Sequence, residues 1–105
     1  AFDRALALLE ARAARADASP EVHQSLAATL SNSGDIYYYA EQYDLALSRF
    51  ERALDMARRP LAGTPESTAR RRLSQALIRT AAAAKEVGRL QDALTLETEA
   101  IALLD

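Results

Sequence analysis

Three groups of side chains have types and spacings that suit chemistry. They are the tyrosine run at 37–39, the arginine run at 70–72 and the single histidine, His23. Tyrosine is enriched at protein interfaces, and arginine binds carboxylates and phosphates through paired hydrogen bonds. Histidine can act as an acid, a base or a metal ligand near neutral pH. Whether these residues bind a ligand, act in catalysis or only pack depends on where they lie on the predicted helices.

No combination of these residues indicates catalysis. His23 falls in the first turn of a predicted helix, off its apolar face, which is typical of a surface residue. The chain has no cysteine, and Gly34, Gly63 and Gly88 stand alone instead of forming a phosphate-binding loop. No cluster of carboxylates has the spacing of a metal site. We therefore expect a protein that is not an enzyme and that has no catalytic residue, no metal site and no cofactor.

The bulk composition favours a helical domain. Half of the 105 residues are hydrophobic, 27% are charged, and glycine and proline number three each. The net charge of −2 gives no bias toward nucleic acid or anionic membranes, and no apolar run approaches the roughly 20 residues of a membrane span. We expect a cytoplasmic protein without a nucleic-acid or membrane partner. Because the chain opens inside a helical pattern without methionine, we also expect a piece of a longer protein.

Apolar residues recur at helical spacing in five segments, at about 2–16, 20–40, 43–59, 65–87 and 90–104. Ser19-Pro20-Glu21 and Thr64-Pro65-Glu66 are start signals, in which Ser19 and Thr64 act as N-caps. The short connections near 41 and 88 require antiparallel helix pairs. The sequence thus predicts an all-α fold. The buried stripes expected on the third and fifth helices are Tyr43, Ala46, Leu47, Phe50, Ala53, Leu54 and Ala57, and Leu90, Ala93, Leu94, Ala100, Ile101 and Leu104.

One sequence signature occurs three times. It reads Phe2-x-x-Ala5-Leu6, then Tyr43-x-x-Ala46-Leu47, then Leu90-x-x-Ala93-Leu94, at intervals of 41 and 47 residues. The best-formed copy lies within 30–54. It combines small residues at Gly34, Ala46 and Ala53, where two helices approach, with large residues at Leu30, Tyr37, Phe50 and Leu54, which fill the remaining space. This stretch resembles a tetratricopeptide repeat, a helix-turn-helix unit of about 34 residues.

The resemblance implies an α-solenoid of antiparallel helix pairs that forms a right-handed superhelix. The chain is then a single domain over 1–105. Residues 1–17 are the second helix of a truncated repeat, 20–60 are repeat two and 64–105 are repeat three. The period of about 45 residues is similar to that of kinesin light chains and many bacterial signalling proteins.

Three residues depart from the family pattern. Arg12 occupies a slot where the family has a small residue, so packing there is expected to be degraded or open. Glu41 stands where Gly88 makes the corresponding turn, and glutamate disfavours the left-handed backbone, so we expect a differently built turn. Glu97 stands where Phe50 stands in repeat two. Since an unpaired buried carboxylate is costly, Glu97 must reach solvent or a basic partner, or else the last helix packs loosely.

Family members bind extended peptides on the concave face formed by their first helices. By slot matching, the resemblance implies a protein-interaction module of a larger signalling or scaffold protein, with a protein or peptide partner. The alternative function is structural self-association without a peptide ligand. Successive helical residues point about 100° apart, so Tyr37 takes the core slot, while Tyr38 and Tyr39 either pack on neighbouring helices or contact the partner. The expected concave residues are Asn32, Asp35, Tyr38, Tyr39, Gln75, Arg79 and Lys85.

The two ends of the predicted stack lack a polar capping face. The first helix has no antiparallel partner, which leaves Phe2 and Leu6 half covered. Leu96 and Leu103 fall off the stripe defined by Leu94 and Ile101. We therefore expect these ends to bind another copy, in a possible homo-oligomer, through Phe2, Leu6, Leu96 and Leu103.

Overall fold

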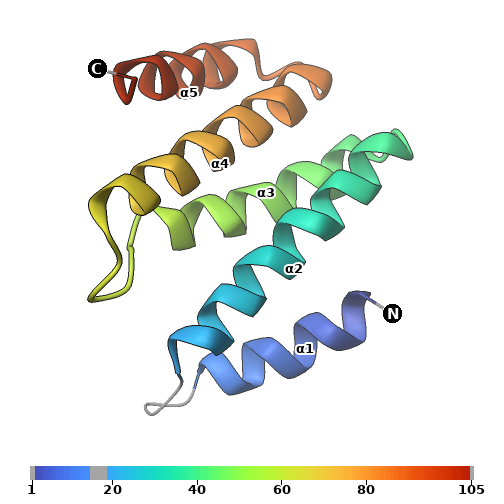
Figure 1. The fold of residues 1–105 in the computed structure, drawn as a ribbon. Helices are drawn as coiled ribbons and strands as arrows, with labels where there is room; N and C mark the ends of the chain where they lie inside the picture. The colour runs from blue at the N-terminus through green and yellow to red at the C-terminus, as the bar shows by residue number, and fades with distance from the viewer. Residues whose placement is uncertain (1, 15–18, 105) are drawn as a thin grey trace.

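Five helices follow one another in the computed structural model, which describes residues 2–14 and 19–104. They are α1 (Phe2–Ala13), α2 (Pro20–Tyr39), α3 (Tyr43–Ala57), α4 (Glu66–Glu86) and α5 (Leu90–Ala102). Each helix packs mainly on the helices next to it in sequence, and consecutive helices run in opposite directions (Figure 1). No strand occurs in the described ranges, and the predicted all-α fold with five helices is confirmed.

The start signals of the two long helices are built differently. At α2 the Ser19 side chain accepts a hydrogen bond from the backbone N–H of Val22 at 3.3 Å, and Pro20 occupies the first helical position, as predicted. At α4 the capping position is Pro65, which offers no side-chain acceptor. The prediction that Thr64 caps α4 is therefore wrong, because the helix begins one residue later than the Ser-Pro-Glu pattern of α2 implies.

The turns after α2 and α4 have the same backbone geometry. Glu41 has a φ of 62° and Gly88 a φ of 85°. After α2 the Gln42 N–H donates a hydrogen bond to the Tyr37 carbonyl at 2.8 Å. After α4 the Arg89 N–H donates to the Ala84 carbonyl, also at 2.8 Å. The expectation that Glu41 forces a different turn is therefore wrong. The hydrogen bonds of the Schellman-type ending hold Glu41 in a left-handed conformation that glycine adopts without strain.

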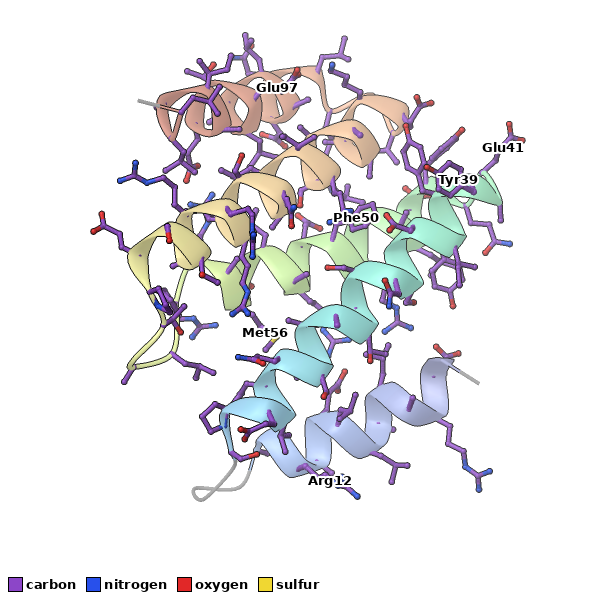
Figure 2. The ribbon with its side chains drawn as sticks, in the orientation of Figure 1. Arg12, Tyr39, Glu41, Phe50, Met56 and Glu97 are labelled. Carbon is purple, nitrogen blue, oxygen red and sulfur yellow. The ribbon has the colours of Figure 1, made fainter. Side chains whose placement is uncertain are left out.

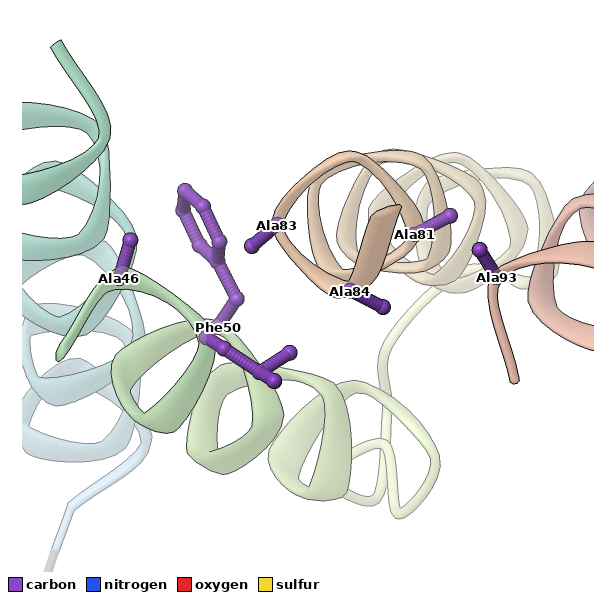
Figure 3. Close-up of a cluster of buried hydrophobic side chains, with 7 residues drawn as sticks. Ala46, Phe50, Ala81, Ala83, Ala84 and Ala93 are labelled. Carbon is purple, nitrogen blue, oxygen red and sulfur yellow. The ribbon is translucent and has the colours of Figure 1, made fainter. Parts of the chain in front are cut away.

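Phe50 is the largest side chain of the main core cluster. Its ring fills the space beside Gly34, where a Cβ would lie only 2.5 Å from the Phe50 Cε1 atom. Figure 3 shows the ring pointing toward Ala83 of α4, while Ala81 of α4 and Ala93 of α5 occupy the next interface. Small residues thus allow close helix approach at each interface, and one aromatic ring fills the space between three helices.

Two further clusters continue the core on either side of Phe50. One joins α1, α2 and α3 through Leu6, Leu26, Leu30 and Ala53. The other joins α3, α4 and α5 through Leu54, Ala76, Leu77 and Ala100. The Phe50 cluster also joins α3, α4 and α5, so it and the cluster of Leu54 lie at different places along the same helices. The core thus extends both across the stack and along the helices of a flat molecule of 39 × 35 × 17 Å.

Ion pairs also join alternate helices. Arg49 of α3 contacts Asp3 of α1 at 2.8 Å. Arg58, just after α3, contacts both carboxylate oxygens of Glu99 in α5, at 2.5 and 2.9 Å. These hydrogen bonds from Arg58 lower the pKa of Glu99 below its ordinary value of 4.5. The pair therefore stabilises the fold above that pH and loses its effect as pH falls through the lowered pKa, although exposure limits it to roughly 1 kcal/mol or less.

The three departures from the repeat pattern have separate outcomes. Arg12 is exposed and its side chain points away from the other helices, so packing at its slot is open (Figure 2). Glu97 is neither buried nor unpaired, because the Lys85 ammonium lies 3.1 Å from its Oε1 atom. The basic partner expected for Glu97 is thus confirmed, and Glu41 adopts the conformation of the glycine it replaces.

The contact between Gly34 and Phe50 predicts an unusual response to alanine. In most helices glycine-to-alanine substitution stabilises by about 1 kcal/mol. Here we expect Gly34→Ala to destabilise by roughly 1–3 kcal/mol, because the methyl group overlaps the ring. In a Phe50→Leu background the penalty should shrink or reverse. Urea denaturation of the four proteins of the cycle measures this coupling, and a stabilising Gly34→Ala in the otherwise unchanged protein would contradict the packing described.

The positive φ of Glu41 predicts a stabilising substitution. Glu41→Gly removes strain of roughly 1–2 kcal/mol, part of which is offset by the greater freedom of glycine in the unfolded chain. We expect a net gain of about 0.5–1 kcal/mol in the free energy of unfolding. The matched control is Ala40→Gly, the preceding residue, where φ is −86° and glycine should destabilise. Equal effects of the two substitutions would show that Glu41 carries no strain.

Candidate functional site

A groove of about 890 Å³ opens between α2 and α4, with α3 beneath it. The two walls lie close together near the C-terminal half of α2 and diverge toward its N-terminal half (Figure 1). Ala53, Met56 and Ala57 of α3 form an apolar floor, and Figure 2 shows Met56 between the diverging helices. The shape follows from the packing, because α2 and α4 rest on different parts of α3.

The walls of the groove are polar. Asn32 on α2 faces Gln75 and Arg79 on α4 across the opening. Three guanidinium groups border the groove, those of Arg59, Arg72 and Arg79, and Glu10 is the one carboxylate among the described lining residues. The lining therefore carries positive charge, although the whole chain has a net charge of −2. Such a groove can hold an extended chain by backbone hydrogen bonds and attract carboxylates.

An ion pair spans the two walls. The Arg79 Nε atom lies 3.3 Å from the Asp35 Oδ1 atom, and both side chains are more than one-third exposed. Asp35 of α2 thereby fixes the position of the Arg79 guanidinium but leaves part of it accessible. The pair links α2 directly to α4 and marks the side of the groove where a partner carboxylate would meet a positioned cation.

Three of the seven residues expected on the concave face line this groove, namely Asn32, Gln75 and Arg79. Asp35 adjoins it through Arg79. The expectation that Tyr38, Tyr39 and Lys85 face the same groove is not met, because none of them is among its lining residues. Lys85 is directed instead to Glu97 of α5.

The tyrosines form a separate cluster at the end of α2. The Tyr38 ring meets the Tyr43 ring edge-on at 5.3 Å between centroids, and it packs against the core cluster that contains Phe50. Burial, followed by the nearby carboxylates of Glu86 and Glu41, raises the pKa of the Tyr43 phenol above 10.0. Tyr39 is 84% exposed (Figure 2). Tyr38 thus has a packing role, and Tyr39 lies at the surface beyond the groove.

Three of the four residues expected to mediate self-association are described, and their burial differs from the expectation. The Phe2 side chain lies outside the described part of the structure. Leu6 is buried against Leu26 and Leu30, because α2 covers the face of α1 that we expected to be half covered. Leu96 and Leu103 pack on the α4 side of α5. Leu6 is thus fully buried instead of half covered, and Leu96 and Leu103 are partly buried on the core-facing side of α5 instead of lying off it.

The fifth helix is rotated relative to the stripe expected from repeat two. Its core-facing side carries Ala93, Leu96, Ala100 and Leu103. Leu90, Leu94, Ile101 and Leu104, which were expected in the core, are exposed. These residues are exposed because α5 has fewer neighbouring helices than α3. α3 is covered by α2 and α4, whereas no described helix covers the side of α5 that faces away from α4.

Several groove residues were absent from the sequence-based set. Met56, Arg59 and Arg72 all line the groove. Arg59 was interpreted only as a favourable charge at a helix end, and it does donate to the Asp55 carbonyl at 3.4 Å. Arg72 belongs to the arginine run, whose members separate in space, since Arg70 pairs with Glu66 at 3.2 Å outside the groove. The repeat period relates corresponding slots, but the divergence of α2 and α4 decides which additional residues reach the opening.

No protein-family description, curated protein or solved structure matches the chain. The tetratricopeptide resemblance accordingly stays a prediction from the residues. Within the described ranges no helix is long and apolar enough to cross a membrane, and no three potential metal ligands of the His, Cys, Asp and Glu types cluster.

The Asp35–Arg79 pair predicts a small energetic coupling. Because both side chains are partly solvated, we expect a double-mutant cycle with Asp35→Ala and Arg79→Ala to give about 0.2–1 kcal/mol. Thermal or urea unfolding at low salt measures it, and added salt should reduce it. A coupling near zero at low salt would show that α2 and α4 are not joined by this pair, and the matched cycle with Glu66 and Arg70 calibrates an ordinary exposed pair.

Proposed function

We propose that this chain is a protein-interaction module whose groove between α2 and α4 binds an extended segment of a partner protein. The observation that carries the proposal is the combination of an apolar floor, at Ala53, Met56 and Ala57, with hydrogen-bonding walls at Asn32 and Gln75. Protein ligands that bind in extended form present alternating side chains and unpaired backbone groups. An apolar floor accommodates side chains of the ligand, and amide side chains on the walls form hydrogen bonds with its backbone groups.

The charge of the groove favours an acidic segment. Arg59, Arg72 and Arg79 border the opening, and Asp35 orients the guanidinium of Arg79. A partner carboxylate that approaches from solvent gains attraction from all three cations, and this attraction is screened by salt. The groove therefore selects against basic segments, although the chain as a whole is slightly acidic.

We also propose that the helices form a tetratricopeptide-like α-solenoid with a right-handed superhelix. Consecutive antiparallel packing, the ion pair from α3 to α1, the pair from Arg58 just after α3 to α5, and the pair between α2 and α4 support the stacking of the helices, while the handedness rests on the family resemblance. In such a stack each repeat contacts its neighbours, and the first helices line one face. On the tetratricopeptide resemblance we propose a role within a larger signalling or scaffold protein.

The experiment selects binders from a displayed library of random peptides and compares variants that differ in the groove alone. Ala28 is exposed and lines the groove, so Ala28→Trp fills it without removing a native contact. Ala7 is exposed on α1 and is not among the described lining residues, so Ala7→Trp is the matched control. Circular dichroism verifies that both variants keep their helicity.

We expect selected peptides to be enriched in Asp and Glu, and their affinity to fall at least tenfold in Ala28→Trp but remain unchanged in Ala7→Trp. Fluorescence anisotropy measures the affinities, and higher salt should weaken binding. Peptides that bind both variants equally would show that the groove is not the site. Enrichment without acidic residues would leave the groove as the site but contradict the electrostatic selection.

A further inference from the structure

The outer side of α5 carries a continuous stripe of exposed aliphatic residues. Leu90, Leu94, Ile101 and Leu104 are between 57% and 78% exposed. With Glu97 between them they follow spacings of four, three, four and three, so the four residues from Leu90 to Ile101 lie along one face of α5. Leu104 follows in the turn after the helix, where its N–H donates to the Ile101 carbonyl at 3.0 Å. Lys85 of α4 contacts Glu97 at 3.1 Å in the middle of the stripe. Large aliphatic side chains at this spacing, interrupted once by the ion-paired Glu97, are typical of a helix face that another helix covers.

The protein itself contains a covered version of this face. In repeat order, Leu47 and Leu54 of α3 correspond to Leu94 and Ile101 of α5. Leu47 and Leu54 are each only 6% exposed, because α4 packs over them. The residues of α5 are as apolar as those of α3 but have no covering helix in the described structure. The stripe is therefore a helix-docking face, distinct from the groove between α2 and α4.

Read in reverse about Glu97, the stripe coincides with itself to within one residue. Leu90 and Leu104 each lie seven residues from Glu97, whereas Leu94 and Ile101 lie three and four residues from it. We propose that α5 packs antiparallel against α5 of a second copy, with a two-fold axis near Glu97. This arrangement places Leu90 opposite Leu104 of the other copy and Leu94 opposite Ile101. The Glu97 carboxylates approach each other near the axis, but each arrives with its own Lys85 ammonium, so the centre contains two ion pairs instead of two unpaired negative charges.

The size of the stripe is sufficient for such a pair. Four aliphatic side chains at these exposures present on the order of 500 Å² per copy, or about 1,000 Å² in a symmetric dimer, near the lower limit for a specific interface. A head-to-tail contact with α1 is less favourable, because Leu8 is the one large exposed hydrophobic residue among the described side chains of α1. A two-fold contact uses the whole stripe on both copies and closes at a dimer.

The first test measures mass against concentration by analytical ultracentrifugation. We expect a dimer at about 100 µM protein, and we expect Leu94→Glu combined with Ile101→Glu to raise the dissociation constant at least 100-fold with unchanged helicity. The matched control is Ile36→Glu combined with Leu45→Glu, which adds the same charge at residues that are 52% and 47% exposed elsewhere. The control should remain dimeric. A monomer at this concentration, or a dimer that survives the α5 substitutions, would overturn the proposal.

The second test fixes the register. Because the chain has no cysteine, Glu97→Cys introduces a single thiol next to the proposed two-fold axis. Mild oxidation should convert most of this variant into a disulfide-linked dimer, whereas Leu45→Cys on α3 should stay largely uncrosslinked. Equal crosslinking of the two variants would contradict the α5 interface. Leu94→Glu with Ile101→Lys should dimerise more strongly than Leu94→Glu with Ile101→Glu, since the antiparallel register pairs the new charges, and equal loss of the dimer in these two variants would contradict the register.

The dimer and the groove are separable. Ala28→Trp should abolish peptide binding and leave the mass unchanged, whereas the α5 substitutions should abolish the dimer and leave peptide binding unchanged. Loss of both properties in either variant would show that they share a surface and would overturn the assignment of the dimer to α5.

Discussion

The contact between the Phe50 ring and the backbone at Gly34 sets the spacing of the helices around it. The ring occupies the place that a side chain at residue 34 would need, so α2 and α3 approach more closely than two ordinary helix faces permit. Ala83 packs on the same cluster from α4. One aromatic side chain therefore determines two interfaces, and the positions of α2 and α4 relative to each other depend on how both rest on α3.

The groove is a consequence of this packing. Phe50 and its small neighbours bring α2 and α4 near each other at one end of α3, where Asp35 and Arg79 join them. Toward the other end the two helices separate, and the partly buried Met56 lines the opening between them. A binding surface with an apolar floor thus arises from the angle between well-packed helices. The core residues need only hold that angle, while the groove side chains vary without loss of the fold.

Repeat three solves the same packing problem without an aromatic residue. Ala81 corresponds to Gly34, and Glu97 corresponds to Phe50. Repeat three thus has a methyl group where repeat two has glycine, and it has no aromatic ring that this methyl group would overlap. Thr80, in the slot of Ser33, also differs. Its hydroxyl donates to the Ala76 carbonyl at 2.7 Å and lies 3.3 Å from the Phe50 carbonyl, whereas the buried Ser33 hydroxyl has no partner in the described structure. The interface between α4 and its neighbours is thus packed with alanines and with the hydrogen-bonded Thr80 hydroxyl. Glu97 lies outside it, paired with Lys85.

The sequence by itself determined the five helices, the Ser19 cap and the buried face of α3, because helical periodicity and capping are local properties of the chain. It also marked Asn32, Gln75 and Arg79, since corresponding slots of a repeat point to the same side. Tertiary structure decided the rest. The prediction that Leu94 and Ile101 are buried, made from their correspondence to residues of α3, is wrong. Exposure depends on whether a neighbouring helix is present and not on the helix's own pattern. Glu41 adopts a left-handed conformation because the hydrogen bonds of its turn outweigh its intrinsic preference. Met56 and Arg72 reach the groove because α2 and α4 diverge, and that angle is set by side chains on three different helices.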